Sequence, residues 1–231
     1  MCHKKPSEMN RFAACAFNNI ASSWQMLFGW EPHVIQPGEP VLVWGASGSI
    51  GSIAIHLIQK HGGKPIAVTS SSVKQEYCKS IGAHEVLNRR DYPHLNGDVN
   101  NKKSLMKFMI DVRKAGGGLP KIVFEHTGTD TFNTSIMVCD EGGMVVFCGA
   151  TSGYETTIDV RRIWISQKRI QGSHYYDSKF TGQIINECKD SAFDNLVTDQ
   201  KYTLNDIGEL TSLMEECSPD RVLNNIIINV D

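Results

Sequence analysis

The sequence predicts an α/β fold in which a doubly wound parallel sheet is flanked by helices and followed by a small C-terminal segment. Short apolar runs alternate with stretches of helical periodicity over most of the chain. A glycine-rich turn joins the first of these runs to a helix. Apolar runs of this length are typical of central parallel strands buried on both faces, and their alternation with helices favours right-handed crossovers.

The first strand, turn and helix lie between residues 40 and 72. An apolar run at residues 41–44 leads into Gly45, Gly48 and Gly51, which form a G-x-x-G-x-x-G pattern. The helix that follows has apolar residues at i, i+3, i+4, i+7 and i+8, beginning at Ile50. Because a dinucleotide pyrophosphate binds at such a helix N-terminus, we expect a nucleotide here; the alternative is a tight turn without a ligand. The expected contacts are Gly45, Ser47, Gly48, Ser49, Ile50 and Gly51.

Composition narrows the class of protein further. The chain has 231 residues, a net charge of −2 and seven scattered cysteines without C-x-x-C spacing. This charge gives no reason to expect nucleic acid or an anionic membrane, and the cysteines indicate a reducing compartment without structural zinc. With neither a signal peptide nor an apolar run of membrane-spanning length in the sequence, we expect a cytoplasmic protein that binds no metal.

The remaining elements follow in order along the chain. A helix is expected over residues 12–30, and the helix after the second strand is expected to start near Ser71 or Ser72, where Ser72 and Gln75 resemble a capping box. We expect residues 1–11 to be disordered, residues 12–175 to form the nucleotide-binding domain, and residues 176–231 to be a segment too small to fold alone. The expected strands are residues 41–44, 65–69, 85–88, 122–125, 144–148 and 169–172, and helices are expected near residues 50–61, 72–82, 105–112, 131–138 and 180–189.

The end of the second strand indicates which nicotinamide cofactor binds. NAD-specific folds place an acidic residue there, whereas this chain has Thr69, Ser70 and Ser71, with Lys74 close behind. Hydroxyls and an ammonium group suit a 2′-phosphate, so NADPH is expected, although the serines could simply cap a helix and Lys74 could be solvated. Arg89, beyond the third strand, could close over the adenine or be an ordinary exposed residue.

Several longer phrases resemble the medium-chain dehydrogenase/reductase superfamily, and specifically crotonyl-CoA carboxylase/reductases. They are the glycine turn and residues 22–29, 122–126, 142–148 and 167–174. The resemblance implies a Rossmann fold similar to quinone oxidoreductases. It also implies reduction of an α,β-unsaturated acyl-CoA by NADPH, with capture of carbon dioxide or a proton.

The same resemblance implies roles for individual residues. His126 would help to hold carbon dioxide through a water, or it could merely cap a strand; Thr127 stands where the family usually has proline. Ser22 would contact the nicotinamide carboxamide, or it could be a helix-surface serine. The backbone of Gly149, Ala150 and Thr151 would donate hydrogen bonds to the same carboxamide.

The resemblance also leaves the extent of the protein open. Relatives begin with a large GroES-like catalytic domain, of which this chain keeps only the C-terminal tail at residues 176–231, so the chain is either a fragment or a naturally short protein. An oxidoreductase is therefore weighed against an NADP-binding module without catalysis and against a fragment used only for assembly. The sixth strand, at the sheet edge, is expected to pair with its copy in a homodimer. The competing view is a monomer in which residues 152–157 cover that edge.

Overall fold

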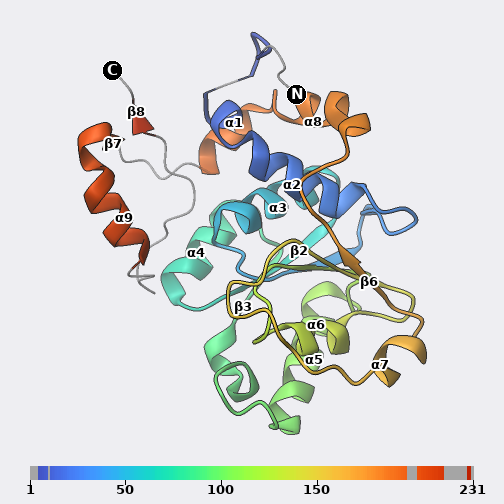
Figure 1. Ribbon diagram of the computed structural model, residues 1–231. Helices are drawn as coiled ribbons and strands as arrows, with labels where there is room; N and C mark the ends of the chain where they lie inside the picture. The colour runs from blue at the N-terminus through green and yellow to red at the C-terminus, as the bar shows by residue number, and fades with distance from the viewer. Residues whose placement is uncertain (1–4, 10, 197–201, 216–227, 230–231) are drawn as a thin grey trace.

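The computed structural model describes residues 5–9, 11–196, 202–215 and 228–229. Its centre is a six-stranded parallel sheet with strand order β3-β2-β1-β4-β5-β6 (Figure 1). The chain begins in the middle of the sheet, runs to one edge, returns and runs to the other edge, which makes the sheet doubly wound. The strands are β1 (Pro40–Val43), β2 (Lys64–Thr69), β3 (Glu85–Asn88), β4 (Ile122–Glu125), β5 (Met144–Phe147) and β6 (Arg169–Gly172).

Helices cover both faces of this sheet because alternate strand residues point to opposite sides. On one face Val41 and Val43 pack with Leu57, and on the other Leu42 packs with Phe108. The first face carries α1 (Arg11–Cys15), α2 (Phe17–Phe28), α3 (Ser49–Lys60), α4 (Ser72–Ser80) and α8 (Thr181–Glu187), and the second carries α5 (Lys102–Gly116) and α6 (Phe132–Val138).

The predicted strands agree with the structure to within a residue at each end, but two helix predictions need correction. The helix expected over residues 12–30 is divided at Ala16, whose ψ of 7° departs from helical geometry, and it ends at Phe28. The residue that caps α4 is Ser71 and not Ser72: the Ser71 hydroxyl accepts a hydrogen bond from Lys74 N at 3.4 Å. The N-cap lies one residue earlier than the capping box predicts, because Ser71 still has the extended backbone that an N-cap requires.

The start of the C-terminal segment packs against the first face of the sheet domain. Lys60 of α3 forms ion pairs with Glu187 at 2.8 Å and with Asp190 at 3.0 Å. Phe193 is completely buried beside the ring of His56. Residues 181–196 are therefore continuous with the core formed by α1, α2 and α3.

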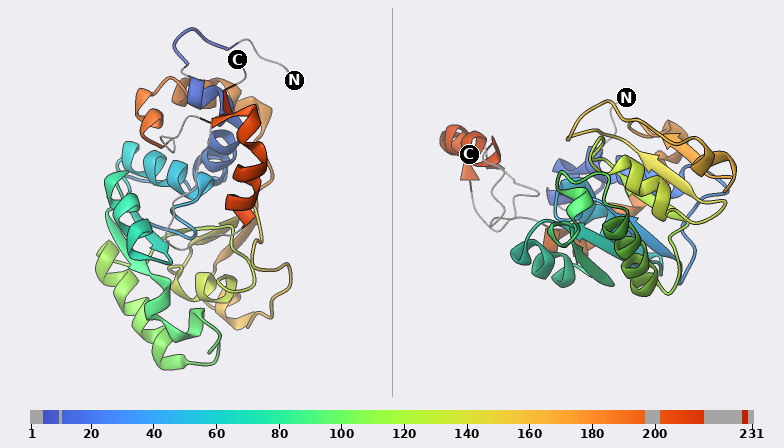
Figure 2. Two further views of the ribbon diagram at one scale, coloured as in Figure 1. Left: turned by 90° about the vertical axis from the view of Figure 1, so that its left-hand side faces the viewer. Right: turned by 90° about the horizontal axis from the view of Figure 1, so that it is seen from below.

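The two ends of the chain are described only in part. Met9 is buried in the core, whereas residues 1–4 and 10, for which disorder was expected, lie outside the described residues. Beyond residue 201, β7 (Tyr202–Thr203) pairs in parallel with β8 (Ile228–Asn229), and α9 (Ile207–Glu215) lies at one side of the molecule (Figure 2). Residues 225–230 have a β-like alternation of apolar residues in the sequence, and of these the structure describes only residues 228–229. Among the helices of the described residues, none is long and apolar enough to cross a membrane.

Candidate nucleotide-binding site

The glycine turn lies at the carboxyl end of β1, in the middle of the sheet. Gly45 has a left-handed backbone with φ of +51°, and Gly48 is the N-cap of α3 without a side-chain cap of its own. A Cβ on Gly51 would lie 2.5 Å from Gly45 O, so only glycine lets the helix approach the turn this closely. Ser47, Ser49 and Ile50 complete the turn and are partly buried. The arrangement leaves the α3 N-terminus facing the strand ends, where a pyrophosphate would bind.

The end of β2 carries the predicted ribose-phosphate residues. Thr69 is 4% exposed and its hydroxyl has no hydrogen-bond partner in the structure, which is uncommon for a buried polar atom. Ser70 and Lys74 are partly exposed, and Lys74 forms no ion pair within the described residues. Ser71 is occupied as the cap of α4. An unpartnered hydroxyl and a free ammonium group are therefore brought to the same corner of the sheet.

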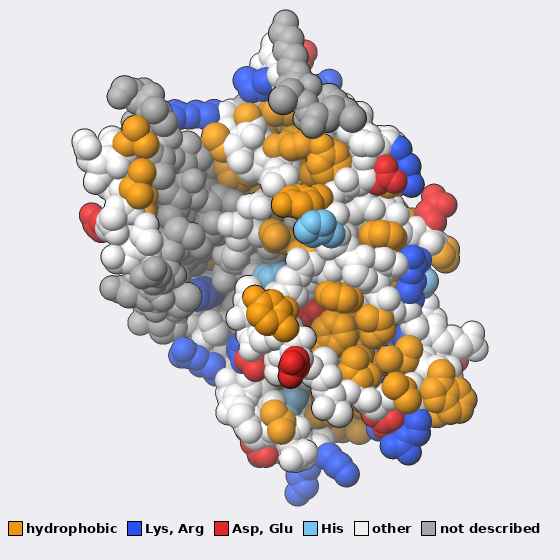
Figure 3. Space-filling view, in the orientation of Figure 1, with side chains coloured by type: hydrophobic (Ala, Val, Ile, Leu, Met, Phe, Trp, Pro, Cys, Tyr) orange, Lys and Arg blue, Asp and Glu red, His pale blue; other side chains and the backbone are white. Residues whose placement is uncertain are grey.

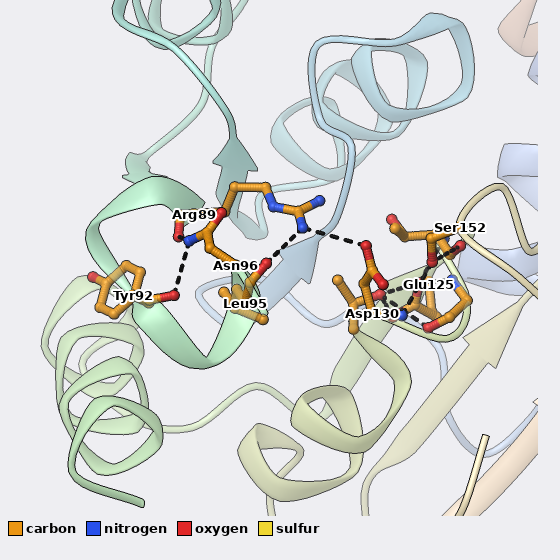
Figure 4. Close-up of polar contacts among 10 residues, drawn as sticks. Arg89, Tyr92, Leu95, Asn96, Glu125, Asp130 and Ser152 are labelled. Carbon is orange, nitrogen blue, oxygen red and sulfur yellow. Dashed lines mark hydrogen bonds and ion pairs between the residues drawn. The ribbon is translucent and has the colours of Figure 1, made fainter. Parts of the chain in front are cut away.

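Arg89 lies beyond β3 and reaches across the strand ends (Figure 4). Its guanidinium donates to Leu95 O at 2.7 Å and forms an ion pair with Asp130 at 3.4 Å. Asp130 N in turn donates to the Ser152 hydroxyl at 3.1 Å. The side chain of Arg89 thus connects the loop after β3 with the turn after β4, and does not extend freely into solvent.

His126 follows β4 and lies directly against the glycine turn. Its Nε2 is 2.9 Å from Trp44 O, and a Cβ on Gly45 would lie 2.6 Å from the Cε1 atom of the ring. Burial of the ring lowers the pKa of His126, although the adjacent Glu125 carboxylate opposes this, so the neutral imidazole is favoured. Thr127 N donates to Glu125 Oε1 at 2.6 Å, a bond that a proline at this position could not form.

The loop after β5 packs beside this turn. Thr151 N donates to His126 O at 3.4 Å, and Gly128 packs against Ala150 so closely that a Cβ there would lie 2.9 Å from Ala150 Cα. Gly149 is exposed and Ala150 partly so. The predicted nicotinamide residues and His126 therefore belong to one continuous set of turns.

Ser22 is the predicted residue that the structure connects least to this set. It is partly buried on α2, and its hydroxyl forms no hydrogen bond among the described residues. The neighbouring Ser23 hydroxyl donates to Ile50 O at 3.3 Å, which ties α2 to the first turn of α3. The role of Ser22 stays a prediction.

Four residues at the site were missed from the sequence: Trp44, Glu125, Asp130 and Ser152. Glu125 is completely buried and accepts hydrogen bonds from the backbone and from two hydroxyls. A charged residue ending the otherwise apolar strand β4 was the signal that could have identified it. Asp130 and Ser152 gave no such signal, because polar residues in exposed loops are ordinary.

A hollow of about 700 Å³ adjoins the site beyond β5. Its wall is mainly apolar and contains Phe132, Phe147 and Ile170, together with Ala150 and Tyr154 from the loop after β5. Hydrophobic side chains gather on this face of the molecule in Figure 3. The hollow therefore lies between the predicted nicotinamide residues and the free edge of the sheet.

The fold and the glycine turn define a dinucleotide-binding protein, and the comparisons with known proteins identify its family. The family described as zinc-binding dehydrogenase matches residues 49–190, which is more than half of the chain. The chain belongs to this family, within the medium-chain dehydrogenase/reductase superfamily. Among the described residues no group of three or more His, Cys, Asp or Glu side chains could hold a metal ion.

The chain is similar to curated crotonyl-CoA enzymes. It is 39% identical over 188 residues to the crotonyl-CoA carboxylase/reductase of Cereibacter sphaeroides, covering 76% of this chain and 44% of that protein. It is 36% identical over 176 residues to the crotonyl-CoA reductase of Streptomyces collinus, covering 74% of this chain and 39% of that one. The chain thus spans less than half the length of these curated relatives.

Solved structures of related enzymes have the same fold as this chain. The crotonyl-CoA carboxylase/reductase AntE in complex with NADP matches 99% of this chain and 58% of its own, with 36% identity and a TM-score of 0.86. The 2-octenoyl-CoA carboxylase reductase CinF, in complex with NADP and 2-octenoyl-CoA, matches 99% of this chain and 52% of its own, with 29% identity and a TM-score of 0.84.

Proposed function

We propose that this chain forms the nucleotide-binding part of an NADPH-dependent oxidoreductase that reduces an enoyl-CoA, with carbon dioxide capture as a second outcome of the same reaction. The observation that carries the proposal is the likeness over 99% of the chain to an NADP complex, at a TM-score of 0.86. The glycine turn, the unpartnered Thr69 hydroxyl and the arrangement of His126 beside the turn all support it.

The choice of NADPH over NADH rests on charge at the end of β2. Thr69 replaces the carboxylate that would hold ribose hydroxyls and repel a 2′-phosphate. Lys74, partly exposed and without an ion pair among the described residues, can approach a phosphate from the first turn of α4. Arg89 could lie along the adenine, in which case Asp130 would hold it in place.

The bound cofactor would supply the hydride, and the residues of this chain would position it. The backbone of Gly149, Ala150 and Thr151 would hold the carboxamide, with Ser22 as a further contact. His126 would face the reacting end of the cofactor. The CinF complex holds 2-octenoyl-CoA, and we extend this substrate class, an acyl-CoA, to the present protein.

Two measurements test the proposed function. Calorimetry with NADPH and with NADH should give tighter binding of NADPH, and equal affinities would contradict the assignment of Thr69 and Lys74. Oxidation of NADPH should then follow when crotonyl-CoA is added, with and without bicarbonate. Binding without any oxidation across a series of enoyl-CoA chain lengths would favour the alternative, an NADP-binding module that has no catalysis of its own.

We further propose a homodimer formed through β6. This strand ends the sheet and has no partner on its outer side among the described residues. The loop at residues 152–157 hydrogen bonds to the turn after β4 and to α6: Thr129 N donates to Gly153 O, and Asn133 Nδ2 to Thr157 O. Trp164 and Ile165, close to β6 in sequence, are 67% and 59% exposed and add apolar surface.

We also propose that the protein resides in a reducing compartment such as the cytoplasm. Five cysteines lie within the described residues and all are free thiols. Burial raises the pKa of Cys78 and of Cys139 to about 12, so these thiols stay protonated and behave as small apolar side chains.

A further inference from the structure

A buried carboxylate organises the turn that carries His126. Glu125 is 0% exposed, and its Oε1 accepts hydrogen bonds from the backbone N–H of Thr127 at 2.6 Å and of Gly128 at 3.2 Å. The Thr131 hydroxyl lies 2.9 Å from Oε2, and the Ser135 hydroxyl lies 2.6 Å from the same atom. Figure 4 shows Glu125 among the residues at this turn. Since a buried carboxylate needs such donors, all four groups are held in place around it.

The direction of each hydrogen bond follows from the chemistry of the groups. Trp44 Nε1 lies 2.7 Å from Ser135 Oγ, and an indole N–H can only donate. Ser135 therefore accepts from Trp44 and gives its own proton to Glu125. Trp44 is 1% exposed and stacks on Phe108, so its position is fixed by packing as well.

The backbone carbonyl of Trp44 also contacts the ring of His126. Trp44 O is 2.9 Å from His126 Nε2, and a carbonyl oxygen can only accept. Nε2 therefore carries the proton. Because burial lowers the pKa of His126, the ring is neutral near pH 7 and Nδ1 has a free lone pair. Apart from the backbone of His126 itself, which also faces the ring, no residue among those described forms a hydrogen bond with Nδ1.

These contacts close a circuit that runs from Glu125 through Ser135 and Trp44 to His126, which is bonded to Glu125 in the chain. We propose that Glu125, Ser135 and Trp44 are positioning residues that hold His126 in its Nε2–H tautomer, with Nδ1 as a hydrogen-bond acceptor. A group that binds Nδ1 must then be a donor, such as a water or an amide N–H, and not a bare carbonyl or oxyanion. Only this last step rests on the proposed function.

Long-range ¹H–¹⁵N correlation NMR of the nucleotide-free protein tests the tautomer directly, with His126→Asn used to assign the signals. The wild type should give Nε2–H alone. Glu125→Met keeps the chain length but removes every acceptor, and should give a mixture of both tautomers. Glu125→Gln keeps an oxygen for the two backbone N–H groups but places an NH2 donor where the Ser135 hydroxyl needs an acceptor, so it should also give a mixture of both tautomers. Glu141→Met, at an exposed site outside the circuit, is the control and should resemble the wild type.

The outcomes separate this proposal from the proposed function. An Nδ1–H signal in the wild type overturns the proposal, as does an unchanged tautomer in folded Glu125→Met. If Glu125→Met does not fold, Ser135→Ala takes its place, since it breaks the link between Trp44 and Glu125, and an unchanged tautomer there also overturns the proposal. Failure to bind NADPH or to oxidise it would contradict the proposed function and leave the NMR result standing.

Discussion

The three glycines of the turn share a spacing but meet different neighbours at the scale of single residues. Gly51 admits the close approach of Gly45 O, and Gly48 is the N-cap of α3. Gly45 has a left-handed backbone, and the ring of His126 lies against it where a Cβ atom would be. The first glycine is therefore required by the histidine as much as by any phosphate.

Replacing Gly45 by alanine tests this double requirement. The left-handed backbone alone costs about 1–2 kcal/mol for alanine, and the displaced His126 ring should add to that cost and weaken NADPH binding. Gly142→Ala is the matched control, since Gly142 has φ of +66° and nothing within 4 Å of an added Cβ. Urea unfolding and calorimetry measure both effects. Equal losses of stability in the two variants, with NADPH binding intact in both, would refute the role assigned to His126 packing.

Lys74 offers a second prediction at the residue scale. A charge-assisted hydrogen bond contributes about 1.5–3 kcal/mol, so Lys74→Ala should weaken NADPH binding by roughly tenfold or more and leave NADH nearly unchanged. Lys79→Ala, on an exposed site near the end of the same helix, is the control. The prediction fails if calorimetry finds the two cofactors weakened alike.

At the scale of elements, ionic contacts fasten the segment after α8 to α3. Burial alone would raise the pKa of Asp190, but hydrogen bonds from Ala192 N, Lys60 and His56 outweigh it and lower that pKa to about 2. The folded state therefore binds the proton less readily than the unfolded chain, whose carboxyl titrates near 3.8. The stability from this group is present above pH 3.8 and is lost as the pH falls towards 2.

Asp190→Asn tests how much the contacts of Asp190 with Lys60 and His56 contribute to the stability of the fold. At pH 7 the variant should be less stable by about 1 kcal/mol, the upper range for a partly exposed ion pair, and it should lose less stability than the wild type between pH 4 and pH 2. Asp194→Asn, at an exposed site in the same segment, should behave as the wild type does. Denaturant unfolding at a series of pH values gives the free energy of unfolding of each variant. An equal loss of stability below pH 4 in Asp190→Asn and the wild type would exclude the Asp190 contacts as a source of acid sensitivity.

For the whole molecule, the free edge of the sheet is the feature with the largest consequence. Arg169 N donates to Gly143 O just before β5, and Ser173 N donates to Phe147 O of β5, so the alternating N–H groups of Ile170 and Gly172 point outward. Ile170 also lines the apolar hollow beside the edge. A second copy of β6 could pair with these groups in a two-fold arrangement.

Ile170→Pro removes one outward N–H without removing a bond to β5, a substitution that edge strands tolerate. The wild type should be a dimer by light scattering at micromolar concentration, and the proline variant should have the mass of one chain. Ile170→Val keeps the N–H group and should remain dimeric. A wild-type mass of one chain that does not change on concentration would reject the dimer.

Local sequence was sufficient to predict the strands and the glycine turn. It also located the end of β2, where Thr69 takes the place of an acidic residue. Apolar runs, glycines and helical periodicity depend on neighbours within a few residues, and these signals survive in a single sequence. The family resemblance added the roles expected of His126 and Ser22, which the fold alone does not test.

Tertiary structure decided the contacts between residues that are far apart in the chain. Trp44 and Ser135 are 91 positions apart, and their hydrogen bond joins the end of β1 to α6. Arg89 and Asp130 likewise meet only because β3 and β4 end at the same edge of the sheet. No periodicity encodes such pairs, because they depend on strand order, and strand order is settled by packing of the whole sheet. The sequence by itself determined which turn could bind a nucleotide, and the tertiary structure decided which side chains hold that turn in place.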